Sequence, residues 1–471
     1  MTPTATPPAS SRAYGTNNPV VPRLRRIAGL FATIPPFTWL AYDFAVAALS
    51  MVWAYFHSPL AWEAFNLPRH LAWGSASLIF GISLAITSHV FGLHDRTTRR
   101  TVTGLITQSL IAVLVAIVAL VTISSIFFYQ DVGRNILGLS AIGTTSALVL
   151  SRAFAWHFAT RHPECIGLLG NRAFVNKAQA FLEATGRPIR LCPVVLDEKE
   201  THVVSLSSLP NWAALMQMDE IVFHGEPTPE IRDALLRCLD TGVRVISYTA
   251  HMEKNHECVA VNELSESWFL SNDIRALHPH YMILKRASDI FISALGLILS
   301  SPLMLLAVIA IKLESPGPAF YKQTRIGLRN RPFSIYKLRS MRLDAEKDGA
   351  QWAGKNDKRI LRVGKILRKT RMDEVPQFWN ILRGDMAFIG PRPERPEFVD
   401  SLAAAIPYYR QRHLVKPGLT GWAQINVDYG ASIEDAREKL RYDLYYVKEA
   451  SLKFDLHVCI RTIGAIMRGA R

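Results

Sequence analysis

Four long apolar stretches dominate the first third of the chain, at about residues 37–58, 71–92, 104–128 and 136–158. Each is close to the ~20 residues that an α-helix needs to cross the hydrocarbon core of a bilayer. The pattern therefore predicts a four-helix transmembrane domain over residues 23–160. Asp43 lies inside the first stretch, near its cytoplasmic end, where snorkelling or a hydrogen bond within the bundle is favoured over a functional role.

Arginines indicate which ends of these stretches face the cytoplasm. They gather before the first stretch, between the second and third, and after the fourth: Arg12, Arg23, Arg25, Arg26; Arg96, Arg99, Arg100; Arg152, Arg161, Arg172. Because cationic loops stay on the cytoplasmic side, both ends of the bundle are expected there. Residues 1–22 lack the basic start and apolar core of a signal peptide, and we predict a disordered cytoplasmic tail.

Short apolar runs alternate with amphipathic helical segments over residues 161–262. This alternation predicts a doubly wound α/β domain with a parallel sheet, a degenerate Rossmann-like domain. Gly167 and Gly170 are an incomplete dinucleotide fingerprint, which needs a third glycine at fixed spacing. A structural or regulatory role is therefore favoured over nucleotide binding, and the sequence does not identify a ligand.

A fifth apolar run, residues 287–313, follows a predicted linker at 263–281 and lies in a domain expected to span 282–471. Ser301 and Pro302 lie near its middle. Proline removes one backbone donor from a helix, and serine hydroxyls can bond to the freed backbone groups. Cations lie at both ends of the run, so we predict a re-entrant helix–break–helix that enters and leaves by the cytoplasmic face. An ordinary kinked span is the alternative.

Composition narrows the partners. The chain of 471 residues is 49% hydrophobic and has a net charge of +15, which suits cytoplasmic loops and anionic lipid headgroups. Nucleic acid is not expected as a partner, because the basic regions alternate with hydrophobic spans and contain no known binding motif. The five cysteines are scattered without a CxxC pair, which argues against a zinc site or a disulfide framework.

The strongest chemical signal is GKILRKTRMDEVPQFWNILRGDMAFIGPR, residues 364–392. From Lys355 to Arg371 there are eight Lys or Arg residues and one acid, and such a run should attract phosphates. Asp373 and Glu374 follow directly. A carboxylate beside a bound diphosphate can attack phosphorus or hold a divalent cation. Taken alone, the pair would more simply stabilise a helix N-terminus.

This segment and four others together resemble the bacterial polyprenyl-phosphate sugar-phosphate transferases, also called phosphoglycosyl transferases. The others are LKRASDIFISALGLILSSP (284–302), ESPGPAFYKQTRIGLRNRPFSIYKLRSM (314–341), GPRPERPEFV (390–399) and KPGLTGWAQIN (416–426). The resemblance covers about residues 281–471. It implies a membrane α-helical bundle, an α/β doubly wound domain and a mainly α, monotopic catalytic domain with a re-entrant membrane helix. The run at 392–413 is similar to exopolysaccharide-assembly members, including exosortase-associated ones.

The resemblance also implies a reaction. A sugar-1-phosphate would pass from a UDP-sugar to undecaprenyl or another polyprenyl phosphate, giving a polyprenyl-diphosphate sugar and UMP. Asp373 would be the nucleophile of an aspartyl-phosphosugar intermediate, and Glu374 would hold Mg²⁺. The expected place is the cytoplasmic face of a bacterial inner membrane, at the first membrane step of exopolysaccharide assembly. The partners implied are the UDP-sugar, the polyprenyl phosphate and the lipid bilayer, and a homo-oligomer stays open. The sugar and the polysaccharide are not determined.

Further residues take roles from the same motifs. Arg368, Arg392, Lys337 and Arg339 are the expected phosphate-binding cations, and Asp385 is expected to support the site from behind the groups that touch substrate. For most of these cations a solvated or lipid-facing charge is as good an explanation. Arg392 is favoured because the prolines on either side stiffen the backbone that presents it. A turn explains Asp385 equally well.

Other functions fit the sequence less well. A non-catalytic transporter or a nucleotide-sensing component of a polysaccharide assembly system would not need an acid pair beside a cation cluster. A transporter would also place more polar residues in its spans. A sugar-to-sugar glycosyltransferase would be expected to carry a DxD-type metal motif in the α/β region, and the sequence has none there.

Overall fold

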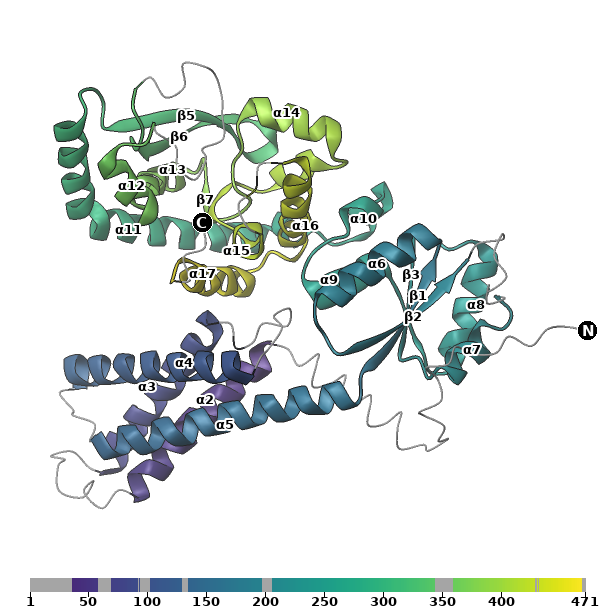
Figure 1. Cartoon of the computed structure of the whole chain (residues 1–471). Helices are drawn as coiled ribbons and strands as arrows, with labels where there is room; N and C mark the ends of the chain where they lie inside the picture. Colours follow the sequence, from purple (N-terminus) through teal and green to yellow (C-terminus); the bar gives the residue numbers. More distant parts are fainter. Residues whose placement is uncertain are drawn as a thin grey trace, which may run out of the picture. The chain divides into compact units, whose positions relative to one another are not determined.

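The computed structural model describes residues 36–57, 69–91, 93, 102–128, 134–196, 206–343, 359–427, 430 and 432–467. The chain divides into two compact units, Met1–His256 and Glu257–Arg471. Figure 1 labels the elements of both units. The predicted linker at 263–281 falls within the second unit, where Trp268 and Phe269 pack against its apolar core.

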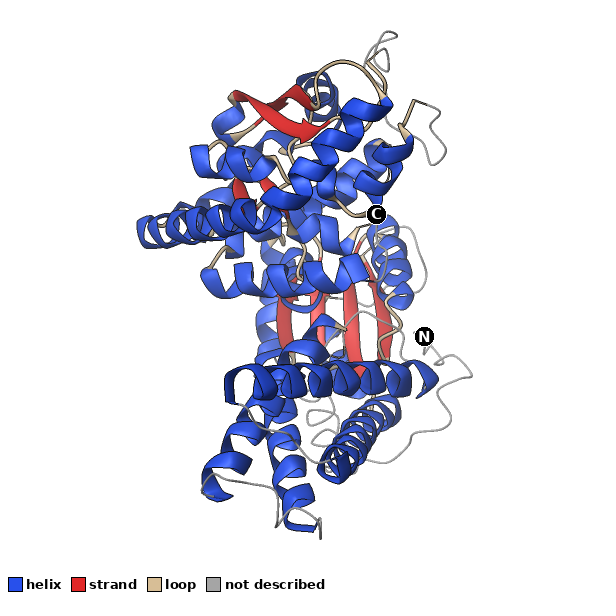
Figure 2. Cartoon of the chain, turned by 90° about the vertical axis from the view of Figure 1, so that its left-hand side faces the viewer, coloured by secondary structure: helices blue, strands red, loops and turns tan. Residues whose placement is uncertain are grey.

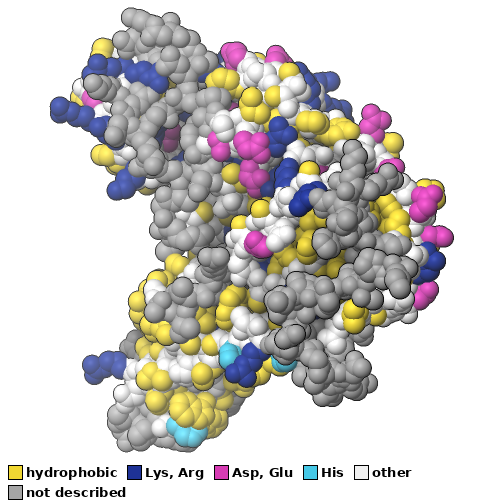
Figure 3. Space-filling model, turned by 45° about the vertical axis from the view of Figure 1, so that its right-hand side comes forward, with side chains coloured by type: hydrophobic (Ala, Val, Ile, Leu, Met, Phe, Trp, Pro, Cys, Tyr) yellow, Lys and Arg dark blue, Asp and Glu magenta, His cyan; other side chains and the backbone are white. Residues whose placement is uncertain are grey.

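The first unit begins with a bundle of apolar helices in the places where the hydropathy pattern predicts them. They are α2 (Pro36–His57), α3 (Arg69–Val90), α4 (Val102–Ile123) with a π-turn η2 (Ser124–Phe128), and α5 (Arg134–Arg161). Small, aliphatic and aromatic side chains such as Ala47, Leu120 and Phe80 fill the centre of the bundle. Large apolar side chains also cover its outside (Figure 3), and Ile142 and Leu150 are each 68% exposed. An apolar outer surface is what a helix bundle needs in lipid.

Length and composition separate these helices. Among the described residues, four helices are long and apolar enough to cross a membrane: Thr38–His57, Leu105–Ile126, Arg134–Arg161 and Pro279–Glu314. The apolar part of α3, Gly74–Val90, is shorter. Three of the four predicted spans are therefore among these candidates, and the predicted re-entrant segment is the fourth. As a whole α3 has 22 residues, as many as α2 and α4.

Asp43 is the partner of an arginine. Nη2 of Arg152 on α5 donates to Oδ1 of Asp43 on α2 at 2.6 Å, and both side chains are fully buried. The guanidinium also lies over the ring of Trp39. Of the explanations that the sequence left open for Asp43, the structure supports the hydrogen bond within the bundle.

A parallel sheet follows the bundle, as predicted. Its elements are β1 (Glu164–Gly170), α6 (Arg172–Ala184), β2 (Ile189–Val195), α7 (Leu209–Leu215), β3 (Glu220–Phe223), α8 (Pro229–Asp240), β4 (Arg244–Ser247) and α9 (Tyr248–His256). The strand order is β2-β1-β3-β4, and Figure 2 shows the strands side by side. Alternate residues of β1 face opposite ways: Cys165 and Leu169 pack towards α7 and α8, and Ile166 and Leu168 towards α6. Helices therefore bury both faces of the sheet.

Aromatic side chains fill the edge of this sheet where a nucleotide would be expected. In open α/β sheets, ligands bind beyond the carboxyl ends of the strands, at the point where the strand order reverses. Here Phe174 stacks on His224 at 4.4 Å and meets Tyr248 edge-on at 5.0 Å. A Cβ added to Gly170 would lie 2.6 Å from Phe174. This packing agrees with a structural role for the domain.

The second unit is mainly helical. Its elements before the acid pair are η3 (Val261–Glu263), α10 (Glu266–Ser271), η4 (Arg275–Leu277), α11 (Pro279–Glu314), β5 (Phe320–Ile326), η5 (Leu328–Asn330), β6 (Pro332–Leu338) and α12 (Arg362–Lys369). The pair lies in η6 (Met372–Glu374). After it come α13 (Gln377–Arg383), β7 (Ala387–Ile389), α14 (Pro396–Ala405), η7 (Tyr409–Leu414), β8 (Gly418–Thr420), α15 (Trp422–Asn426), α16 (Ile433–Glu449) and α17 (Leu452–Met467). β5 and β6 pair antiparallel, and β7 and β8 pair parallel.

The predicted break at Ser301 and Pro302 is a bend within one continuous helix. α11 contains Pro302, and Figure 1 shows two arms that run in different directions. Proline has no N–H for the carbonyl of Ile298, one turn earlier. The hydroxyl of Ser301 donates to that carbonyl at 2.8 Å instead. The helix therefore bends while the carbonyl of Ile298 still accepts a hydrogen bond. Many side chains around the bend are exposed and apolar, including Ile298, Leu299 and Leu303.

α11 is docked on the helix that follows the acid pair. Gly296 lies against the ring of Phe378 on α13, so close that an added Cβ would lie 2.9 Å from the ring. Nη1 and Nη2 of Arg286 donate to the carbonyls of Ile381 and Leu382 at the end of α13. A cation at a helix C-terminus satisfies free carbonyls and favours the helix dipole. α11 is therefore fixed directly to the helix that follows the acid pair.

Candidate active site

A sharp corner between two helices presents the acid pair. α12 ends at Lys369 and is capped by Thr370, whose hydroxyl donates to the carbonyl of Ile366 at 2.9 Å. Arg371 follows in the left-handed conformation, with φ of 60°, and the 3₁₀ turn η6 then carries Asp373 and Glu374. Pro376 precedes α13 and favours a helix start there, because its fixed φ is already helical. The local sequence thus places both carboxyl groups at the corner.

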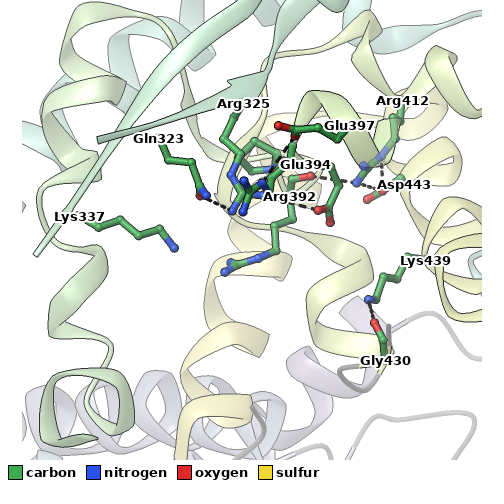
Figure 4. A network of polar contacts seen from close by, with 12 residues as sticks. Gln323, Arg325, Lys337, Arg392, Glu394, Glu397, Arg412, Gly430, Lys439 and Asp443 are labelled. Atoms are coloured by element: carbon green, nitrogen blue, oxygen red, sulfur yellow. Dashed lines mark hydrogen bonds and ion pairs between the residues drawn. The ribbon is translucent and has the colours of Figure 1, made fainter. Parts of the chain in front are cut away.

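Both acids are buried there, and Glu374 has two ion-pair partners. Asp373 is 7% exposed and Glu374 is 8% exposed. Oε1 of Glu374 accepts from Nζ of Lys337 at 3.1 Å and from Nη2 of Arg392 at 2.9 Å. Lys337 comes from β6 and Arg392 from the loop after β7, and Figure 4 shows both side chains. Within the part of the chain that the structure describes, no ion pair is found for Asp373.

Burial and charge shift the two carboxyl groups in opposite directions. Burial, and then the negative charge of Glu374, raise the pKa of Asp373, although Lys337 and Arg368 oppose the rise. Burial also acts against ionisation of Glu374, but Arg392 and Lys337 outweigh it and hold the pKa of Glu374 well below its usual range. Burial lowers the pKa of Lys337, and Glu374 opposes that change. Neighbouring acids with separated pKa values are typical of sites where each has its own role.

The oxygen donors suit magnesium in a limited way. No group of three or more His, Cys, Asp or Glu residues in the described ranges forms a metal site. Mg²⁺, however, is often bound through one or two carboxylates together with the phosphates of a substrate. The hydrogen bonds found for Glu374 in the described chain use Oε1, which leaves Oε2 as a possible ligand for a metal ion. The pair therefore fits an ion that arrives with a diphosphate, and does not form a cage by itself.

The other predicted phosphate-binding residues lie in different places. Arg368 is half-buried on the last turn of α12, and its charge acts on Asp373, so the structure brings it to the pair. Arg339 is buried, and its Nη1 and Nη2 donate to the carbonyls of Pro316 and Ser315 at 2.8 and 2.6 Å. The structure therefore uses its guanidinium to hold the turn after α11, and does not bring it to the acids.

Asp385 lies on the far end of α13 from the pair. Its Oδ2 lies 3.6 Å from Nε of Arg383 and 3.5 Å from Nδ2 of Asn380. Neither contact reaches Glu374 or Asp373. The structure thus places Asp385 at the turn that closes α13, where Gly384 adopts φ of 94°.

Sequence reasoning missed Asn380, which connects two parts of the site. It is fully buried on α13, and its Oδ1 accepts from the backbone N–H of Tyr336 at 3.0 Å. Its Nδ2 donates to the carbonyl of Ser334 at 2.7 Å. These bonds fix β6, and hence Lys337, against the helix that follows Glu374. The available signal was an asparagine inside an apolar helical segment, where its helix propensity is poor.

Glycines allow the loop that carries Arg392 to approach its support closely. A Cβ on Gly390 would lie 2.4 Å from the carbonyl oxygen of Lys416, and one on Gly418 would lie 2.1 Å from the amide nitrogen of Gly390. The backbones lie side by side here, where β7 and β8 pair, with a bond from Gly390 N to Thr420 O of 2.9 Å. The segments GPRP and KPGLTG thus depend on each other, because only glycine fits between two backbones at this distance.

Comparisons with known proteins point to one family. Residues 280–469 match the family model described as bacterial sugar transferase. The UDP-N-acetylgalactosamine-undecaprenyl-phosphate N-acetylgalactosaminephosphotransferase of Aeromonas hydrophila is 49% identical over 191 residues, which are 41% of this chain and 45% of that protein. The UDP-glucose:undecaprenyl-phosphate glucose-1-phosphate transferase of Caulobacter vibrioides is 43% identical over 185 residues, or 39% of this chain and 69% of that one.

A third relative is covered almost completely. The exopolysaccharide production protein PSS of Rhizobium leguminosarum bv. phaseoli is 40% identical over 191 residues, which are 39% of this chain and 94% of that protein. The chain thus matches less than half of the length of the Aeromonas relative and nearly all of the Rhizobium one. The family match falls on the unit that holds Asp373 and Glu374.

Proposed function

We propose, from the premise that this chain belongs to the bacterial sugar transferase family, that it transfers a sugar-1-phosphate from a UDP-sugar to a polyprenyl phosphate. The observation that carries the proposal is the contrast within the acid pair. Glu374 is neutralised by two cations, whereas Asp373 is buried without an ion pair in the described chain and adjoins Arg368 and Arg371. A desolvated carboxylate beside cations is suited to attack a phosphoryl group that those cations attract.

The reaction would proceed in two displacements. An oxygen of the Asp373 carboxylate forms a bond to the phosphorus next to the sugar, the bond between that phosphorus and the bridging oxygen breaks, and UMP leaves. A phosphate oxygen of the polyprenyl phosphate then attacks the same phosphorus, and Asp373 leaves with its carboxylate restored. Covalent catalysis of this kind divides one difficult transfer into two easier ones.

The other residues of the site would orient and neutralise. Lys337 and Arg392 meet at Glu374 and present cationic groups from two elements, and a guanidinium can bind phosphate oxygens in pairs. Glu374 would hold Mg²⁺ together with phosphate oxygens of the donor. When bound, the ion would reduce the repulsion between the donor's diphosphate and an anionic nucleophile.

The membrane setting supports a lipid acceptor. α11 exposes Ile298, Leu299 and Leu303 at its bend and is fixed to α13 through Arg286. We propose that α11 is re-entrant in a bacterial inner membrane and that the acid pair lies on the cytoplasmic face. Membership in an exopolysaccharide assembly system is part of the proposal, and it is supported by the name of the Rhizobium relative.

The test is release of UMP. Membranes containing the protein are incubated with a panel of UDP-sugars and polyprenyl phosphate, and D373N is compared with wild type and with D400N. Asp400 is an exposed aspartate of the same unit, paired with Arg410, so D400N controls for loss of a carboxylate. We expect UMP and a labelled lipid product with one or two donors from wild type and D400N, and neither from D373N. Full activity in D373N would exclude Asp373 as the nucleophile.

A further inference from the structure

The loop that carries Arg392 is held by its carbonyl groups. Four consecutive carbonyls each accept one hydrogen bond: Pro391 O from Gly418 N at 2.9 Å, Arg392 O from Arg412 Nη2 at 3.0 Å, Pro393 O from Arg325 Nη1 at 3.2 Å, and Glu394 O from Ile326 N at 2.9 Å. The two prolines have no N–H, so the loop depends on these carbonyls for its position. Two of the four donors are arginine side chains.

Arg412 is itself fixed on every side. Its side chain is 4% exposed, and its Nε and Nη2 donate to Oδ2 of Asp443 at 3.0 and 2.7 Å. Its Nη1 donates to the hydroxyl of Tyr409 at 3.0 Å, and the guanidinium lies over the Tyr409 ring. Figure 4 shows Arg412 between Asp443 and the loop. A buried guanidinium held in this way has one orientation available for the carbonyl of Arg392.

Arg325 holds the loop from β5. Its Nη2 donates to Oε1 of Gln323 at 2.8 Å, and its Nη1 lies 3.6 Å from a carboxylate oxygen of Glu394. Gln323 thus orients the guanidinium that reaches Pro393. Gln323 and Arg325 belong to the family-like segment at 314–341, and these contacts give both residues a role.

We propose that Arg412, held by Asp443, is a positioning residue that fixes the backbone of Arg392 so that its guanidinium lies where Glu374 and the donor's diphosphate meet. This inference rests on the proposed function. Nη2 of Arg392 lies 2.9 Å from Oε1 of Glu374, and this distance depends on where the loop holds the backbone of Arg392. A backbone shift of about 1 Å near a reacting group can cost up to about a hundredfold in rate.

The first test separates positioning from general stability. R412K keeps the charge but loses the fork that reaches Asp443 and the carbonyl together. D443N keeps the arginine and removes its counter-charge. R410K is the control, since Arg410 lies on the same η7 segment and forms an exposed ion pair with Asp400. We expect R412K to raise KM for the UDP-sugar about tenfold, D443N to raise it less, and R410K to leave it unchanged. Partial unfolding would lower the active fraction and kcat without moving KM.

The second test asks whether Arg412 acts through Arg392. Binding of UDP to the solubilised full chain is measured for R412K, R392A and the double variant. If the proposal holds, the double variant binds UDP as weakly as R392A alone, because the group that Arg412 positions has gone. Additive losses, or an R412K protein with the KM of R410K, would overturn it. If wild type releases no UMP from any UDP-sugar, the proposed function fails, and the UDP affinities still decide on Arg412.

Discussion

Two neighbouring carboxyl groups, Asp373 and Glu374, have nearly equal burial and pKa values that are shifted in opposite directions. Burial opposes the ionisation of both, but Glu374 has Lys337 and Arg392 within 3.1 Å, whereas Asp373 has no ion pair in the described chain and has the negative charge of Glu374 beside it. Folding therefore favours the charged form of one acid and the neutral form of the other. A group kept in an unfavourable state is a source of reactivity and also a cost to stability.

The first prediction concerns the stability of D373N. Because the pKa of Asp373 is raised in the folded protein, its ionised form destabilises the fold at neutral pH. D373N should therefore melt a few degrees higher than wild type at pH 7, for a gain of about 1 kcal/mol. The gain should fade as the pH falls through the raised pKa towards the ordinary value near 3.8, because the carboxyl is then protonated in both states. Thermal melting of the solubilised protein between pH 4 and 8, at about one-unit steps, measures it.

The second prediction is the opposite sign for E374Q. The depressed pKa of Glu374 means that its ionised form stabilises the fold above the ordinary glutamate pKa, and that this stability is lost as the pH falls through the depressed value. E374Q leaves Lys337 and Arg392 without their shared anion, so it should lower the stability at pH 7 by about 2 kcal/mol. Equal melting temperatures for D373N and E374Q at neutral pH would contradict both predictions.

Sequence reasoning reached the acid pair but not the partners of each residue. Lys337, Arg339, Arg368 and Arg392 were all predicted as phosphate-binding cations, with Arg392 favoured. Tertiary contacts separate them further: two reach Glu374, one acts on Asp373 and Arg339 bonds to carbonyls after α11. The role of a cation depends on which carbonyl or carboxylate the fold brings beside it. Arg412 and Asp443 were missed for the same reason, because their contact joins η7 to α16.

At the scale of elements, close backbone contacts and helix ends build the site. Gly390 and Gly418 allow the paired backbones of β7 and β8 to lie close together, and Arg286 caps α13. α11 bends at Pro302, where the hydroxyl of Ser301 takes the place of the missing N–H. These features were only partly visible in the sequence. The apolar runs predicted the helices of the bundle well, because a span needs a fixed length. The sequence predicted a break at Ser301 and Pro302, whereas the structure has one continuous helix in which the hydroxyl of Ser301 bonds to the carbonyl of Ile298.

The third prediction concerns the close backbone contact between the paired strands β7 and β8. G418A would place a Cβ 2.1 Å from the amide nitrogen of Gly390, and neither backbone can move without breaking the pairing. We expect a loss of more than about 3 kcal/mol or failure to accumulate folded protein. G138A on α5 is the matched control, because no atom lies within 4 Å of the added Cβ, and it should melt like wild type or slightly higher. A G418A protein that melts like G138A would show that the backbones of Gly390 and Gly418 do not need to lie so close.

At the scale of the whole molecule, the apolar helices and the acid pair must be reconciled with one membrane. The family predicted from the motifs is confirmed, and the α/β domain has the predicted parallel sheet. The re-entrant path of α11 stays a prediction, because length and composition alone also allow it to span. The exosortase-associated subgroup and the oligomeric state stay open as well.

The fourth prediction tests the path of α11. Single cysteines are placed at Leu270, before the helix, and at Leu343, after it, where the side chains are 86% and 63% exposed. Leu215 of the α/β domain, 78% exposed, is the control position. Four native cysteines are buried, and the half-buried Cys459 is replaced by serine. An impermeant maleimide should label all three positions in inside-out vesicles and none in right-side-out vesicles. Labelling of Leu343→Cys from the opposite side to Leu270→Cys would mean that α11 crosses.

The measurement that tests the account most directly is the capture of the intermediate. Wild type is incubated with a UDP-sugar that supports UMP release, in the absence of polyprenyl phosphate, and the peptide containing Asp373 is analysed by mass spectrometry. The account predicts an added sugar-phosphate on Asp373, one UMP released per adduct, and loss of the adduct when the lipid is supplied. Turnover in wild type without any adduct on Asp373, or with an adduct on another residue, would contradict it.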